Sequence, residues 1–248
     1  MHTCLNCGTE FSGKYCPECG QKAHVPRLTA KALMNEILHF FTHIEETFFK
    51  TSLYFIIKPG ITSLHYINGK RKRYQKPVSY FLIWAGLYIL LHNFILDRFH
   101  YGLILQENGQ TALQQEANIL LRKHFTFFVL PILFSSSFII WLVLGRSRLY
   151  YFEIFTLSLY GCGSYFLLLI ISDLLLGVIF RINVNHYYVF FWQTLLSFLY
   201  NTWFTVDLFR RLKIGRMAIR TLVASVLISA AGYVIFIYAP AAWIWLFK

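Results

Sequence analysis

The sequence predicts an all-α integral membrane protein with about five transmembrane helices, preceded by an amphipathic juxtamembrane helix and a small cysteine-rich module. The first observation is composition: of 248 residues, 57% are hydrophobic and 14% are charged, whereas a soluble domain has roughly 45–50% apolar and about 25% charged residues. The second is that four of the five cysteines lie before residue 20. The third is a cluster of basic residues directly before the first of five long apolar segments.

Residues 1–24 have the pattern of a zinc ribbon. Two C-x-x-C turns, Cys4 with Cys7 and Cys16 with Cys19, are each followed by a glycine. The short gap lets both sulfurs of a turn face one ion, and glycine permits the positive φ that closes the turn. A disulfide or a redox C-x-x-C is the alternative, but a redox motif needs only one pair and a βαβ context. Four thiolates leave no open coordination position, so we expect one structural zinc per chain.

Residues 25–77 are predicted to form an amphipathic segment at the membrane surface. Their apolar residues recur every three or four positions, as Leu33, Ile37, Phe40, Phe41, Ile44 and Phe48. This spacing predicts an apolar stripe on a helix of about 25 residues that begins near Thr29 and ends at Lys58-Pro59-Gly60. The segment carries too many charges to span a bilayer, so we expect it at the interface or packed on the transmembrane helices.

His39 and His43 form a second candidate metal site. They lie four residues apart, which places both imidazoles on one helical face, with Glu36 and Glu46 nearby. A membrane metalloenzyme would need further ligand pairs, and the sequence has no second H-x-x-x-H, no H-x-x-H and no H-E-x-x-H. Ordinary polar histidines at an interface are the simpler interpretation.

The basic cluster consists of Lys70, Arg71, Lys72, Arg73 and Lys76. Cations next to a transmembrane helix attract anionic lipid headgroups at roughly 1 kcal/mol per Lys or Arg. They also fix the orientation of the helix in the bilayer. The cluster therefore predicts membrane-lipid partners, and the two roles are compatible.

The first 95 residues contain a succession of motifs: Cys4-x-x-Cys7-Gly, Phe11, Gly13, Cys16-x-x-Cys19-Gly-Gln, Arg27-Leu28, Thr51, Pro59-Gly60, Tyr66, Gly69-Lys70-Arg71, Tyr74 and Pro77. This succession resembles the bacterial domain-of-unknown-function 3667 family, whose members look like small membrane proteins with an N-terminal zinc ribbon. The resemblance implies a bacterial inner-membrane location and a bound zinc. It implies no activity, because the family has none assigned that could be carried over.

Five apolar segments make up most of residues 78–248, at 78–96, 125–144, 154–180, 187–206 and 222–247. Each has about the 20 residues that cross roughly 30 Å of hydrocarbon. No apolar leader precedes the cysteines, so we expect a cytosolic N-terminus and, after five spans, a periplasmic C-terminus. This topology places 18 Lys and Arg inside and 5 outside, as the positive-inside rule predicts. It also accounts for most of the net charge of +12, so no nucleic-acid partner is expected.

Asp173 is the strongest candidate for a functional residue within residues 78–248, because it lies inside the predicted span 154–180. A carboxylate at that depth costs several kcal/mol unless it is neutral, paired or hydrated, which makes it a functional candidate. Its potential partners are His92, Arg181, Asn201 and the serine cluster Ser135, Ser136 and Ser137. The simpler interpretation is a packing hydrogen bond between helices.

Three functions are compatible with these features, and no catalytic motif or nucleotide fingerprint is present. The favoured one is not enzymatic: a zinc ribbon and juxtamembrane helix form a cytosolic docking platform for a protein or anionic lipid. The alternatives are a transporter or channel component that uses Asp173, and a histidine-dependent membrane metalloenzyme centred on His39 and His43. The chain could also assemble as a homo-oligomer.

Overall fold

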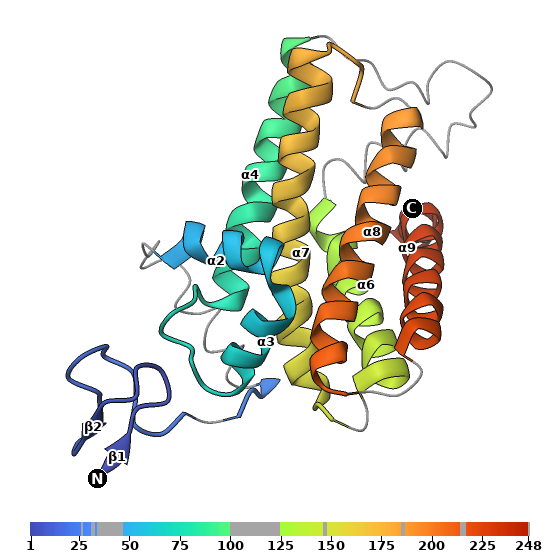
Figure 1. Cartoon of the computed structure of the whole chain (residues 1–248). Coiled ribbons are helices and arrows are strands. Elements are labelled where there is room, and N and C mark those ends of the chain that lie inside the picture. Colours follow the sequence, from blue (N-terminus) through green and yellow to red (C-terminus); the bar gives the residue numbers. More distant parts are fainter. Residues whose placement is uncertain are drawn as a thin grey trace.

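The computed structural model describes residues 1–25, 27–30, 33, 47–99, 125–145, 148–184, 187–213 and 217–247. This part of the chain is mostly helical (Figure 1). Its elements in order are β1 (His2–Thr3), β2 (Glu10–Phe11), α2 (Thr47–Ile57), α3 (Pro59–Ile67), α4 (Pro77–Arg98), α6 (Phe125–Ile140), the π-helical turn η3 (Trp141–Gly145), α7 (Tyr151–Asp173), the π-helical turn η4 (Leu174–Ile179), α8 (Tyr187–Arg211) and α9 (Met217–Phe247).

Each of the five apolar segments predicted from the sequence is helical. They coincide with α4, with α6 and η3, with α7 and η4, with α8, and with α9. Two of these helices, Pro77–Arg98 and Tyr151–Ile179, are long and apolar enough to cross a membrane. The prediction of a mostly helical fold is thereby confirmed, and two of its helices have the length and composition of membrane spans.

Helix α7 is the centre of the bundle, and α4 runs beside it along much of its length (Figure 1). Their close approach depends on Gly163, because a Cβ there would lie 2.7 Å from Cε1 of Tyr80. The Tyr80 hydroxyl and Ser164 Oγ are 2.9 Å apart at the same level. On the other side, α6 and α8 contact α7, and α9 packs against α6 and α8.

Helices α2 and α3 form a short hairpin, of which the sequence predicted only the first member. Helix α2 ends at Ile57, as the Lys58-Pro59-Gly60 signal predicts, but Pro59 then begins α3 instead of a loop. Proline is favoured in the first helical turn, where its missing N–H has no acceptor to lose. Gly60 is required there, because a Cβ would lie 2.4 Å from the Asp207 carbonyl oxygen of α8. Residues 34–46 of the long predicted helix lie outside the described residues.

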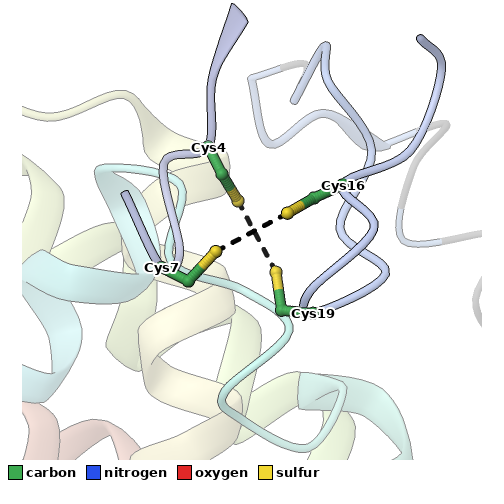
Figure 2. Close-up of side chains that lie close together, drawn as sticks. All are labelled: Cys4, Cys7, Cys16 and Cys19. Carbon is green, nitrogen blue, oxygen red and sulfur yellow. Dashed lines mark hydrogen bonds between the residues drawn. The ribbon is translucent and has the colours of Figure 1, made fainter. Parts of the chain in front are cut away.

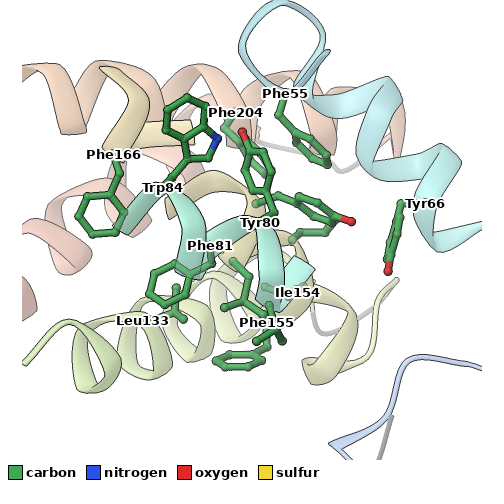
Figure 3. Close-up of a cluster of buried hydrophobic side chains, with 14 of the residues drawn as sticks. Phe55, Tyr66, Tyr80, Phe81, Trp84, Leu133, Ile154, Phe155, Phe166 and Phe204 are labelled. Atoms are coloured by element: carbon green, nitrogen blue, oxygen red, sulfur yellow. The ribbon is translucent and has the colours of Figure 1, made fainter. Parts of the chain in front are cut away.

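The core joins the hairpin to the bundle through aromatic rings (Figure 3). Phe55 of α2 stacks on Tyr160 of α7, with ring centroids 4.2 Å apart and planes at 11°. Phe48 stacks on Trp84 of α4 with centroids 5.0 Å apart. The Trp84 indole N–H donates to Ser52 Oγ over 3.0 Å, so the hairpin is fixed by both stacking and hydrogen bonds.

Helix α2 buries polar side chains beside its aromatic ones and exposes several large apolar side chains. On α2 the buried face includes Thr51 and Ser52, whereas Phe49, Leu53 and Ile57 are exposed by 73%, 56% and 52%. Contiguous apolar exposure of this kind is uncommon on water-soluble monomers and marks an interaction surface.

Candidate metal centre and the basic loop

The four N-terminal cysteines point toward one another (Figure 2). The Sγ atoms of Cys4 and Cys19 are 3.5 Å apart, those of Cys7 and Cys16 are 3.6 Å apart, and all four lie within 4.8 Å of one another. Tetrahedral zinc with Zn–S bonds of about 2.3 Å would place its sulfurs about 3.8 Å apart. All four residues are free thiols. The cluster therefore has the donor set and the spacing of a closed Cys4 metal site.

The two knuckles of this site repeat the same backbone hydrogen bonds. The N–H of Gly8 donates to the Cys4 carbonyl, and the N–H of Gly20 donates to the Cys16 carbonyl, both over 2.9 Å. The glycine φ angles are +84° and +69°, as the sequence predicted from the glycine after each C-x-x-C. Each knuckle is closed by the residue after its glycine, whose carbonyl accepts from the first cysteine's N–H.

The environment of the sulfurs is uneven. The hydroxyl and N–H of Thr9 lower the pKa of the exposed Cys7 to about 6, whereas burial raises the pKa of Cys19 to about 11. A bound cation favours the thiolate form of every ligand. With four sulfur donors, the site can hold an ion for structure and has no coordination position for a reacting water.

Within the part of the chain that the structure describes, these four cysteines are the one metal-type group of three or more His, Cys, Asp or Glu residues. His39 and His43, the predicted second metal pair, lie outside the described residues. The enzyme hypothesis that depends on them stays a prediction.

The ribbon is attached to the basic loop, which we define as residues 68–76, by the side chain of Gln21. Its Oε1 accepts hydrogen bonds from the backbone N–H of Arg71 over 3.2 Å and of Lys72 over 3.1 Å. Gln21 is only 5% exposed, and its own carbonyl closes the second knuckle at Cys16. Gln21 was not among the predicted site residues, although it is the last residue of the motif Cys16-x-x-Cys19-Gly-Gln.

The first knuckle also contacts the basic loop. Gly69 has φ of +97°, and a Cβ there would lie 2.7 Å from Cδ1 of Leu5. Leu5 lies between Cys4 and Cys7, so both knuckles of the ribbon contact the loop. The loop is therefore held on its ribbon side by backbone hydrogen bonds and by a close apolar contact.

The opposite side of the basic loop is fixed to the helices. Gln75 N–H donates to Thr51 Oγ1 over 2.9 Å, and the Tyr160 hydroxyl donates to the Gln75 carbonyl. The buried Tyr74 places its hydroxyl 3.2 Å from Nδ1 of His65. These anchors hold the loop against the helices and leave Lys72, Arg73 and Lys76 exposed.

The five predicted cluster cations differ in their exposure to solvent. Lys72, Arg73 and Lys76 are exposed, while Lys70 and Arg71 are half-buried. The Arg71 guanidinium lies 5.6 Å from the Tyr66 ring centroid. Burial is the main cause that lowers the pKa of His65, and the positive charges of Lys70, Arg73 and Arg211 lower it further.

Asp173 is buried and has two donors. Its Oδ2 lies 2.7 Å from His92 Nδ1, and its Oδ1 accepts from Gln193 Nε2 over 3.0 Å. Among the partners that the sequence left open, the structure pairs it with His92. Asn201 and Ser135 instead donate to carbonyls of their own helices. Gln193 had not been expected, since nothing in the sequence links positions 173 and 193. The carboxylate joins α4, α7 and α8.

Comparison with known proteins gives one match. Residues 45–89 match the model of the family described as Protein of unknown function (DUF3667). The match confirms the resemblance over the helical hairpin, the basic loop and the first half of α4; it is narrower than residues 1–95, and the ribbon lies outside it. No curated protein and no solved structure matches the chain.

Proposed function

We propose that this chain is a multi-pass membrane protein whose zinc-bound cytosolic ribbon holds a basic loop in place as a docking platform for an anionic partner. The observation that carries this proposal is the pair of hydrogen bonds from Arg71 N–H and Lys72 N–H to Gln21. They make the conformation of the loop depend on a residue two positions after a metal-type cysteine.

Membrane embedding by five helices in the bacterial inner membrane is supported by the outer faces of the bundle. Exposed apolar side chains recur on one face of several helices, at Leu87, Leu90 and Phe94 on α4, at Phe191, Leu195 and Leu199 on α8, and at Leu222, Val223 and Val226 on α9. Hydrocarbon is the solvent that such faces require. The excess of Lys and Arg on the N-terminal side supports a cytosolic ribbon and a periplasmic C-terminus.

Zinc as the resident ion is supported by the chemistry of the donors. Thiolate ligands select soft or borderline ions, and four of them at tetrahedral spacing suit zinc. The ribbon has little else to order it, since its buried apolar cluster is Cys4, Phe11 and Cys16. One zinc per chain would then supply most of the folding free energy of this segment.

The docking role is supported by unbalanced charge. Among the described residues, no carboxylate forms an ion pair with Lys70, Arg71, Lys72, Arg73 or Lys76. An exposed group of like charges held in a fixed loop attracts anionic surfaces, and the attraction weakens with salt.

The test replaces all five cluster cations by glutamine in the full-length chain. The protein in lipid nanodiscs is titrated with two anionic probes, phosphatidylglycerol and a polyglutamate peptide. The matched control removes five exposed cations elsewhere: Lys14, Lys22, Arg98, Arg181 and Arg220. We expect the cluster variant to lose affinity for at least one probe and the control to keep it. Equal binding of both probes by the wild type and the cluster variant would refute the platform.

The transporter alternative has one favourable observation, the buried His92–Asp173 pair, since ionisable pairs inside membrane bundles often mark ion paths. Both carboxylate oxygens of Asp173 already accept hydrogen bonds. That arrangement favours a cross-link between helices over an ion-binding role.

A further inference from the structure

The surface of α2 carries two stripes next to each other. Residues four apart lie on one face of a helix. One stripe is polar and the other is apolar. Lys50 and Tyr54 form the polar stripe, which Lys58 continues directly after the last residue of α2, and Phe49, Leu53 and Ile57 form the apolar stripe. Lys50 and Lys58 are exposed, as is the whole apolar stripe. A ligand that contacts both stripes needs an anionic part beside an apolar part.

Arg73 brings a third cation to the polar stripe from the basic loop. Its guanidinium lies 5.3 Å from the Tyr54 ring centroid, and Nη2 donates to the Tyr54 hydroxyl over 3.3 Å. A guanidinium has five N–H donors, so others remain for a ligand. The hydrogen bond and charge of Arg73, followed by the charges of Lys50 and Lys58, lower the pKa of the Tyr54 phenol, in agreement with the contact between Arg73 and Tyr54. None of the three is in an ion pair among the described residues.

We propose that Lys50, Tyr54, Lys58 and Arg73 form a binding site for the phosphate of one anionic phospholipid, with an acyl chain along Phe49, Leu53 and Ile57. The proposal rests on the platform function above and locates its lipid ligand beside α2, where Arg73 is the one member of the five-cation cluster that takes part. Arginine and lysine bind phosphate through charge-assisted hydrogen bonds, and the phenol adds one donor. A free phosphate ion would not contact the three exposed apolar side chains, whereas the acyl chain of a lipid would. We therefore assign a lipid.

The experiment is native mass spectrometry of the delipidated, full-length protein in neutral detergent, titrated with phosphatidylglycerol. The test variant is Lys50→Gln, Lys58→Gln, Arg73→Gln. The matched control is Lys70→Gln, Lys72→Gln, Lys76→Gln, which removes the same charge from the basic loop alone. All six side chains are at least partly exposed, and zinc content and thermal stability monitor folding. We expect one bound lipid in the wild type and the control, and an apparent Kd weaker by about tenfold or more in the test variant.

Leu53→Ser tests the apolar half of the site without changing its charge. It should also weaken lipid binding, whereas inorganic phosphate in the millimolar range should fail to displace the lipid. Displacement by phosphate would overturn the assignment to a lipid. Loss of binding in the control with retention in the test variant would overturn this site and leave the platform standing. An equal loss of lipid affinity in both variants would mean that the lipid responds to the total positive charge of the surface, and it would also overturn the site.

Discussion

The ribbon and the helical bundle achieve order by opposite means. In the ribbon the buried cluster contains Cys4, Phe11 and Cys16, and order comes from sulfurs and backbone hydrogen bonds within 25 residues of chain. In the bundle, order comes from rings and polar groups far apart in sequence, such as Phe55 with Tyr160 and Asp173 with His92. From this difference we expect the ribbon to lose its structure without zinc while the bundle keeps its own. Gln21 and Leu5 connect the ribbon to the basic loop.

The largest expected effect is a loss of zinc from the ribbon that leaves the helices of the bundle folded. The double substitution Cys16→Ser, Cys19→Ser removes two of four ligands, and structural zinc sites contribute roughly 10–16 kcal/mol of apparent binding free energy. We expect metal content by plasma mass spectrometry to fall from one zinc per chain to none, while the helical circular dichroism signal stays. Cys162→Ser is the control, since this residue lies on α7 away from the cluster; zinc retained by the double variant would contradict the assignment.

A smaller effect is expected from the buried polar contacts of the bundle. Asp173→Leu leaves the donors of His92 and Gln193 without their acceptor, at a cost of about 1–3 kcal/mol. The melting temperature should fall and the zinc content should not change. Adding His92→Leu should restore part of the loss, because removing both partners is nearly neutral. An unchanged melting temperature for Asp173→Leu would show that the carboxylate does not stabilise the bundle.

The junction should respond to a change that affects neither region by itself. Gln21→Ala removes the acceptor of two hydrogen bonds, worth about 1 kcal/mol each. Hydrogen exchange at the Lys72 amide should become about tenfold faster or more, with zinc content unchanged. The Arg71 amide, which also donates to the Gly69 carbonyl over 2.9 Å, should respond less. Glu18→Ala, at an exposed ribbon position, should leave both amides protected. Equal exchange in the two variants would mean that the ribbon does not hold the loop.

The smallest expected effect is a pH dependence at His65, behind the basic loop. Burial and the neighbouring cations lower its pKa in the folded state, so the unfolded chain takes up the proton first. Stability should therefore decrease as the pH falls below about 6.5, the unperturbed pKa of histidine. Melting temperatures at pH 7.5 and 5.5 should differ more for the wild type than for His65→Gln. An equal difference would show that His65 is not the source of the pH dependence.

The sequence was most informative where a motif is local. Spacing and glycine placement predicted the Cys4 cluster and the positive φ of Gly8 and Gly20, because a knuckle is built within five residues. The length of the apolar segments predicted the five helices, because this signal too lies within one continuous stretch of chain. The Lys58-Pro59-Gly60 sequence correctly predicted the end of α2. It did not predict that Pro59 also begins α3, because that helix depends on Gly60 packing against α8.

Contacts between distant segments could not be predicted. The hydrogen bonds of Gln21 with Arg71 and Lys72 join residues 50 and 51 positions apart, and no periodicity encodes such a pair. The Tyr54–Arg73 contact is similar, since it depends on how the basic loop folds back over α2. Asp173 was a candidate because it lies in the middle of an apolar segment. The sequence offered His92 only as one of several possible partners, and it gave no indication of Gln193.

The most direct test of the central claim is trypsin cleavage of the basic loop before and after zinc is removed by a chelator from the full-length protein. The loop offers cleavage sites after Lys70, Arg71, Lys72 and Arg73. If the ribbon holds the loop, removal of zinc should accelerate cleavage at these sites by about tenfold or more, and added zinc should restore protection. Cleavage at the same rate with and without zinc, once metal loss has been verified, would contradict the claim.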